Sequence, residues 1–248
     1  MTGTNLQHKA TLGWIGLGKM GAPIVTNLIK AGFQVTVYDV DARRAAELAA
    51  SGARVADSVA ALAAASELVD YVAAPVSGST VLAEKAQLTV FASGPQPAFQ
   101  RALPAFEALS ARQYYVGGDE QARYLKLAIN HLVGSTAVLL AEALTLGEKG
   151  GLDWQQMLTV IGDSVAASPL VKYKLEPLKA RNFAPAFSSS QMLKDMSLVV
   201  DAGAAAGVPM AAAALVREQF AQYVQRDGAE LDFFSIVRAV ALHVLRKL

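Results

Sequence analysis

Cysteine is absent from this sequence, and histidine occurs only at His8, His131 and His243. Without cysteine the chain cannot form a disulfide framework, use a thiolate as a nucleophile or bind a metal through sulfur. Three histidines supply few alternative ligands, so we expect neither a structural nor a catalytic metal.

Charge is scarce and nearly balanced. Lys and Arg number 22 and Asp and Glu 21, which gives a net charge of +1, and charged residues make up 17% of the 248 positions. Since no basic run is present, the sequence gives no electrostatic footprint for nucleic acid or a membrane surface, and we expect neither partner. With 53% hydrophobic residues, the chain is typical of a compact, soluble α/β protein and is long enough for two domains.

Long apolar runs are also missing. Residues 1–9 are polar and lack the apolar stretch of a signal peptide, so we expect a cytoplasmic protein. The most apolar later stretch, residues 202–216, contains two glycines and a proline and is shorter than the ~20 residues of a membrane span. We interpret it as buried helices. The alanine richness of the chain as a whole, with its positive mean hydropathy, fits closely packed helices and a subunit interface, and the core of a monomer is the alternative.

A strand, a glycine-rich turn and a helix begin the ordered pattern. Residues 12–15 predict a short buried strand, and residues 20–31 predict a helix with apolar residues at helical spacing. Residues 16–21 between them read G-L-G-K-M-G, the spacing of a dinucleotide fingerprint in the required context. An ordinary strand-to-helix turn is the alternative.

Each glycine of this turn has a physical role in holding a dinucleotide. Gly16 permits the tight turn, Gly18 lets the backbone approach a pyrophosphate, and Gly21 lets helix and strand pack closely. The helix N-terminus presents its free N–H groups to the phosphates. The predicted cofactor-binding loop consists of Gly16, Leu17, Gly18, Lys19, Met20 and Gly21.

The next strand, residues 33–38, alternates and is rich in β-formers, and it ends at Asp39. An acid there can accept hydrogen bonds from the hydroxyls of the adenosine ribose, which favours NAD. A 2′-phosphate would be repelled, although Arg43 and Arg44 could partly compensate. Helix capping is the alternative role, more so for Asp41 than for Asp39.

Strand and helix patterns alternate up to about Gly118, and every later segment has helical spacing without a convincing strand. The sequence therefore predicts a Rossmann-like dinucleotide-binding domain over residues 1–118 and an all-helical domain over residues 119–248. One long helix over residues 119–148 would connect them, with Gly134 tolerated inside it. Further helices are expected over residues 153–161, 169–180, 191–206, 209–225 and 232–246.

On the long helix, Lys126 and Asn130 stand four residues apart and so share one face. An ammonium can donate a proton to an aldehyde oxygen as hydride reaches the carbon, while an amide holds the oxygen or the lysine. A solvated helix face is the alternative.

Four motifs together resemble the β-hydroxyacid dehydrogenase family. They are residues 16–21, Ala74–Ser79, Lys126–Asn130 and the pair Lys194-Asp195, which occur in family order over nearly the whole chain. The resemblance implies a Rossmann domain that binds NAD or NADP and an all-helical domain that completes the active site. It also implies association through the helical domain, as a homodimer or homotetramer.

The resemblance makes Lys126 the general acid/base and Asn130 its neighbouring substrate ligand. It assigns Ser77 and Gly78 to the loop that binds the carboxylate of a small hydroxyacid or aldehyde acid. N–H groups and a hydroxyl can hold a carboxylate without a second cation beside the lysine. An ordinary turn after a strand is the local alternative for this loop.

Three further residues receive roles by the same resemblance. Phe187 supplies an apolar wall to the substrate pocket, Lys194 lies near the cofactor and Asp195 lies near the substrate. Taken alone, the last two read as helix-surface charge. Within the family, Ser79, the Lys194-Asp195 pair and Leu231-Asp232-Phe233 look more like the glyoxylate and succinic semialdehyde reductases, which more often prefer NADPH.

The sequence departs from the family in three places. Ala73 replaces a familiar acid, and Glu120 and Ala122 replace glycines ahead of the lysine helix. The largest departure follows residue 69, where on the order of fifty residues, about two crossover units, are missing. Residues 68–75 could form one strand beside the first strand.

Two hypotheses follow. The first is an active NAD(P)-dependent reductase of small aldehyde acids, of the 3-hydroxyisobutyrate, glyoxylate or succinic semialdehyde type. The second is a shortened, catalytically impaired relative that acts as a nucleotide-binding or oligomeric interaction protein.

Overall fold

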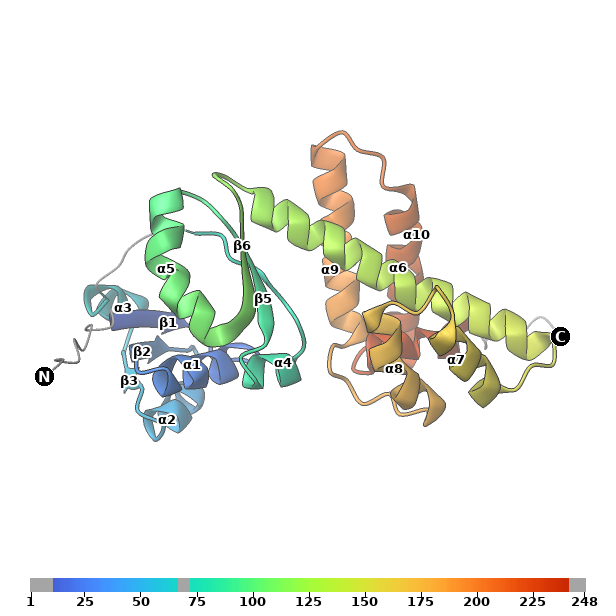
Figure 1. Cartoon of the computed structure of the whole chain (residues 1–248), viewed down its shortest axis with the longest axis horizontal. Coiled ribbons are helices and arrows are strands. Elements are labelled where there is room, and N and C mark those ends of the chain that lie inside the picture. The colour runs from blue at the N-terminus through green and yellow to red at the C-terminus, as the bar shows by residue number, and fades with distance from the viewer. Residues whose placement is uncertain (1–10, 67–71, 241–248) are drawn as a thin grey trace, which may run out of the picture. The chain divides into compact units, whose positions relative to one another are not determined.

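A computed structural model describes residues 11–66 and 72–240 and divides the chain into two units, Met1–Lys126 and Leu127–Leu248 (Figure 1). The division falls inside the longest helix. The first unit alternates strands and helices and the second is helical, so the predicted α/β class with an all-helical C-terminal part is confirmed.

The first sheet carries the predicted strand, glycine turn and helix. Its three strands are parallel in the order β1-β2-β3, and Ile15 at the end of β1 pairs with Tyr38 at the end of β2. The elements are β1 (Thr11–Ile15), α1 (Gly21–Lys30), β2 (Gln34–Tyr38), α2 (Ala42–Ala49), β3 (Arg54–Val55) and α3 (Val59–Ala64).

The second sheet, in the order β4-β5-β6, is mixed: β4 runs antiparallel to β5, and β6 runs parallel to β5. Helix α1 contacts α4 and α5, so both sheets share one apolar core. The elements are β4 (Val76–Ser77), α4 (Thr80–Glu84), β5 (Leu88–Ser93), α5 (Gln96–Leu109) and β6 (Ser110–Gly117).

The expected strand over residues 68–75 beside the first strand is wrong in its described part. Ala73 bridges to Ser93, and the Phe91 N–H donates to the Pro75 carbonyl at 3.0 Å, so this extended segment lies against β5. The segment continues directly into β4. The chain then passes through the short helix α4 into β5, which runs antiparallel to β4. Residues 67–71 lie outside the described residues. Within the described ranges β1 pairs with β2 alone, and the two sheets remain separate.

The second unit has helices at the predicted places. No strand follows β6 in the part of the chain that the structure describes. The elements are α6 (Gln121–Lys149), α7 (Trp154–Asp163), α8 (Pro169–Lys179), α9 (Ser189–Ala205), α10 (Ala211–Tyr223), a π-helical turn η1 (Val224–Gly228) and a 3-10 turn η2 (Phe233–Ile236). Of the helix predicted over residues 232–246, residues 241–246 lie outside the description.

Gly134 allows α6 to pack closely against α9. A Cβ at this position would lie 2.8 Å from the Met196 sulfur and 2.9 Å from the Met192 sulfur. Helix α6 is long and apolar enough to cross a membrane by length and composition. One of its faces, including Ala137 and Leu144, is instead buried in the helical core.

The expectation that residues 202–216 form buried helices is only half right. The stretch contains the end of α9 and the start of α10, but only Gly203, Ala213 and Val216 within it are buried. Leu215 is 64% exposed. Helices α9 and α10 pack against each other through small side chains, and most alanines of the stretch lie outside that contact and are not buried.

Lys174 and Asp232 form an ion pair that the sequence did not reveal. The ammonium lies 2.7 Å from the carboxylate, and only 6% of each side chain is exposed. The ammonium also lies 5.1 Å from the centre of the Phe233 ring, and the carboxylate accepts the Phe234 N–H at 3.1 Å. The pair therefore fixes η2 against α8.

Removal of one partner should leave a buried charge uncompensated. We expect Asp232→Ala to lower the free energy of unfolding by about 3–5 kcal/mol, measured by urea denaturation. The control is Asp227→Ala, because Asp227 is 55% exposed and 3.6 Å from Arg238; we expect a loss below about 1 kcal/mol. Equal losses in the two variants would contradict a stabilising role for the buried pair.

Candidate functional site

The glycine loop has the geometry that a dinucleotide requires. Gly16 has φ +93°, and its N–H donates to the Tyr38 carbonyl at 2.9 Å. A Cβ on Gly21 would overlap the Gly16 carbonyl oxygen, so helix α1 can begin this close to β1 only with glycine there. The indole of Trp14, which sequence reasoning missed, donates to the same carbonyl at 2.9 Å and fixes the turn.

Gly18 is the loop position at which the protein itself does not require glycine. Its φ is outside the left-handed region, and a Cβ there would meet nothing within 4 Å. The N–H groups of Gly18, Lys19 and Met20 donate to no acceptor among the described residues. Open space and free donors ahead of a helix N-terminus fit a pyrophosphate, so the loop fits the predicted cofactor.

Asp39 links this loop to the end of β2. One carboxylate oxygen accepts the Leu17 N–H at 2.6 Å, and the other accepts the Asp41 N–H at 2.8 Å. These bonds, that from Leu17 above all, lower the pKa of the Asp39 carboxyl, so it is ionised at neutral pH. Each oxygen keeps a further acceptor position, which a ribose hydroxyl can use.

The capping alternative for Asp41 is confirmed. Its side chain accepts the Arg43 N–H at 3.2 Å at the start of α2. Arg43 also binds the same carboxylate through its guanidinium.

The predicted carboxylate loop lies at the end of β4. Ser77 pairs with Thr89 of β5. Gly78 has φ +138°, and a Cβ there would lie 2.7 Å from the Leu88 side chain, so local structure alone demands this glycine. Ser79 caps α4 by accepting the Leu82 N–H at 3.4 Å. Since capping explains Ser79, this residue is a weak guide to the subgroup.

Asn130 is buried and held in one orientation. Its side-chain amide donates to Asp195 at 2.8 Å, a contact over 65 residues of sequence. Because a carboxylate only accepts, the amide oxygen of Asn130 faces away from it and can accept from an ammonium or a hydroxyl. A solvated helix face is therefore wrong for Asn130, which follows Lys126 by one turn of α6.

The remaining predicted residues lie around α9. Lys194 is 68% exposed and its ammonium lies 2.9 Å from the Asp195 carboxylate, so Asp195 joins Lys194 to Asn130. Phe187 packs edge-on against Phe233, with ring centres 5.9 Å apart. Phe187 is thus fixed by the apolar core of the helical unit.

The two replaced glycines ahead of the lysine helix have local partners. The Ala122 N–H donates to the Ser93 hydroxyl at 3.0 Å, and Ala122 is fully buried. Glu120 lies 3.0 Å from Arg123 in an ion pair. The start of α6 is therefore anchored to the end of β5 in the first unit.

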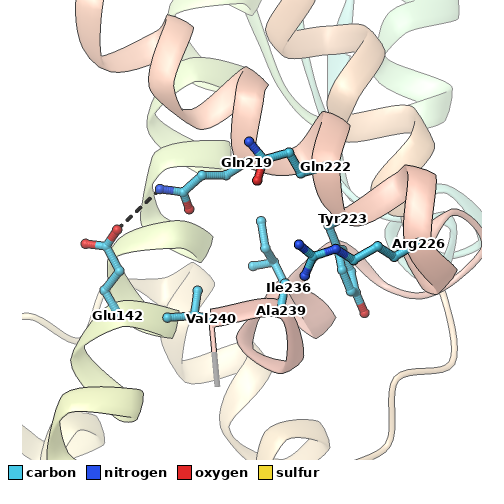
Figure 2. Close-up of a pocket in the computed structure, with 8 residues that line it drawn as sticks. All are labelled: Glu142, Gln219, Gln222, Tyr223, Arg226, Ile236, Ala239 and Val240. Carbon is cyan, nitrogen blue, oxygen red and sulfur yellow. Dashed lines mark hydrogen bonds between the residues drawn. The ribbon is translucent and has the colours of Figure 1, made fainter. Parts of the chain in front are cut away.

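A pocket of about 270 Å³ lies elsewhere in the helical unit (Figure 2). It lies beside α6, α10 and residues 236–240, and in it Gln219 donates to Glu142 at 3.4 Å. None of the predicted site residues lines it.

A glycine loop before α1, an acid after β2 and an oriented Asn130 one turn after Lys126 on α6 are features of an NAD(P)-dependent oxidoreductase. Residues 11–71 and 62–118 match the NAD binding domain of 6-phosphogluconate dehydrogenase. Residues 121–240 match a family described as NAD-binding of NADP-dependent 3-hydroxyisobutyrate dehydrogenase. The chain belongs to the β-hydroxyacid dehydrogenase family, and its cofactor is NAD or NADP.

Known relatives match along most of their length. Glyoxylate/succinic semialdehyde reductase 1 of Arabidopsis thaliana is 28% identical over 92% of this chain and 98% of its own. The 2-(hydroxymethyl)glutarate dehydrogenase of Eubacterium barkeri is 27% identical over 87% and 89%. The fold is similar to Mycobacterium tuberculosis 3-hydroxyisobutyrate dehydrogenase, with TM-score 0.84 and 24% identity over 96% of this chain and 99% of that one.

The alignments also show that this chain is shorter than its relatives. The alignment to the Arabidopsis reductase extends over 282 residues, whereas the whole chain has 248. The two matches to the 6-phosphogluconate dehydrogenase domain overlap at residues 62–71. The relatives therefore contain residues without a counterpart here, as the sequence predicted.

Two glycine substitutions should separate binding from stability. We expect Gly18→Ala to change the free energy of unfolding by less than about 0.5 kcal/mol, because its methyl group enters open space. The same methyl group should weaken NADH and NADPH binding about tenfold or more. We expect Gly21→Ala to lower stability by roughly 2 kcal/mol, since its methyl group overlaps the backbone. Fluorescence titration and urea denaturation measure the two effects. Wild-type cofactor affinity in Gly18→Ala would refute the assignment of the loop.

Proposed function

We propose that this chain reduces small aldehyde acids of the glyoxylate or succinic semialdehyde type with NADH or NADPH, or oxidises the corresponding β-hydroxyacid, of the 3-hydroxyisobutyrate type. The observation that carries the proposal is buried Asn130, whose amide Asp195 orients one helical turn beyond Lys126. The names of the relatives support the substrate class, because those proteins act on short acids of this kind.

The cofactor supplies the hydride that reaches the carbonyl carbon, and the chain supplies the proton. In the direction of reduction, the Lys126 ammonium donates a proton to the carbonyl oxygen; in the reverse direction, the amine accepts it. The amide oxygen of Asn130 accepts a hydrogen bond from the ammonium or from the substrate hydroxyl. The Ser77 hydroxyl and the Gly78 N–H bind the carboxylate of the substrate, which leaves Lys126 as the cation at the reacting end.

We propose NAD as the preferred cofactor. The ionised Asp39 carboxylate at the end of β2 accepts the ribose hydroxyls and repels a 2′-phosphate. This preference opposes the NADP-dependence in the description of the family that residues 121–240 match. The negative charge at Asp39 would act directly on a 2′-phosphate and therefore favours NAD.

The test of function is the rate of NADH and NADPH oxidation with glyoxylate and with succinic semialdehyde. We expect Lys126→Ala to lower turnover at least about 100-fold, because proton transfer by a positioned group contributes roughly 10²–10⁴-fold. Lys172→Ala, the same change at an exposed lysine of α8, should retain the wild-type rate. Full activity in Lys126→Ala, or no wild-type turnover with any of these pairs, would contradict the proposal.

We also propose that the protein is a homodimer or homotetramer assembled through the helical unit. Leu132, Leu139 and Leu146 repeat every seven residues along α6 and are 67%, 64% and 76% exposed. A seven-residue repeat places all three on one side of the helix, as in helices that pack against a partner helix. A row of three exposed leucines is typical of a protein interface.

A charge in this row should separate the subunits. We expect Leu139→Glu to convert the oligomer into monomers, measured by light scattering after size-exclusion chromatography, because the glutamate would be desolvated at the interface. Leu215→Glu on α10 is the matched control, since both leucines are 64% exposed. A monomeric wild-type protein, or an unchanged mass for Leu139→Glu, would be incompatible with this interface.

A further inference from the structure

Asp41 is the centre of an ion-pair cluster at the start of α2. The Nε and Nη2 atoms of Arg43 each lie 3.1 Å from a different oxygen of the Asp41 carboxylate, which is a bidentate contact. The Arg44 Nε atom lies 3.8 Å from the same carboxylate, and its Nη1 atom lies 4.0 Å from Asp39. Both arginines that follow β2 are therefore paired with aspartates.

This pairing matters because of the place of the cluster in the fold. It follows Asp39 directly, at the strand end where a Rossmann fold places the adenosine ribose. A phosphate on the 2′-oxygen of that ribose carries between one and two negative charges at neutral pH and needs a cation to accept it. Arg43 and Arg44 are the arginines available on α2, and two carboxylates balance their two positive charges.

We propose that Asp41 is a specificity-determining residue, which acts with Asp39 to select NAD over NADP by occupying the guanidinium of Arg43 and lying beside that of Arg44. The inference rests on the proposed function, in which the glycine loop holds the cofactor. It adds that the arginines of α2 are held away from a 2′-phosphate by an aspartate which itself need not touch the cofactor.

The competing explanation is that Asp41 only caps α2. The two roles require different properties of the side chain. Capping uses one oxygen as an acceptor for the Arg43 N–H, and asparagine caps helices about as well as aspartate. The selectivity role requires the negative charge. Asp41→Asn therefore keeps the cap and removes the charge, with almost no change in shape.

The experiment measures affinity for 2′,5′-ADP and 5′-ADP by calorimetric titration, and for NADPH and NADH by fluorescence. The two adenosine fragments test only the adenosine half of the site, so the comparison does not depend on turnover. We expect the wild-type chain to prefer the ligands without the 2′-phosphate. In Asp41→Asn the ratio of affinities should shift about tenfold towards the 2′-phosphorylated ligand in each pair.

A second variant tests whether Arg43 carries the effect. Asp41→Asn combined with Arg43→Gln should lose most of the gain, whereas Arg43→Gln alone should leave the ratio near its wild-type value, because that arginine is already neutralised. Higher salt should reduce the gain in Asp41→Asn, since the cluster is exposed and screened.

Equal changes for both members of a ligand pair in Asp41→Asn would show a capping role alone and overturn the proposal, as would an unchanged ratio. A wild-type chain that binds neither NADH nor 5′-ADP would instead overturn the proposed function, and this inference with it. If Asp41→Asn still binds these ligands but the ratio of their affinities does not change, only the selectivity role of Asp41 is overturned.

Discussion

The hydrogen bond from the Leu17 amide to the Asp39 carboxylate is the contact on which the candidate cofactor site depends. The adjacent bond from Gly16 to Tyr38 continues the pairing of β1 with β2, and the Leu17 contact extends it by one residue into the glycine loop. The backbone donor that shapes the loop also stabilises the ionised form of the carboxylate. Loop shape and the negative charge at the end of β2 are therefore coupled, so replacement of Asp39 would disturb both.

Local order could be predicted from the sequence, whereas long-range partners could not. Periodicity and glycine spacing predicted α1, β2 and the long helix α6 to within a few residues, because these features depend on nearest neighbours. Asn130 and Asp195 are 65 residues apart, and Lys174 and Asp232 are 58 apart. In neither pair does the sequence around one residue indicate which residue it contacts. The resemblance named Asn130 and Asp195 separately, and the structure adds the contact that orients the amide.

The prediction that residues 68–75 lie beside the first strand failed for the same reason. An extended pattern predicts a strand, but its neighbour in the sheet depends on the connections around it. The segment that leads into β4 is tied to β5 by α4, and it pairs there rather than with β1. Helix α1 compensates by packing against α4 and α5, so the two sheets still share a single core. The first unit thus keeps a continuous interior although its sheet is divided.

Cofactor binding and turnover depend on different parts of this chain. The loop, α1 and Asp39 are the proposed site for the adenosine half of a dinucleotide, and all belong to one βαβ unit that the structure describes. Lys126, the proposed proton donor, and Asn130 lie on α6, and Asp195, which orients the Asn130 amide, lies on α9. The residues that relatives possess and this chain lacks fall in the second mononucleotide half, which a Rossmann fold uses for the nicotinamide. An impairment caused by the shortening should therefore reduce turnover while the affinity for the adenosine half remains. Binding of 5′-ADP without turnover would support the shortened, impaired relative, whereas turnover that requires Lys126 would show that the remaining residues suffice.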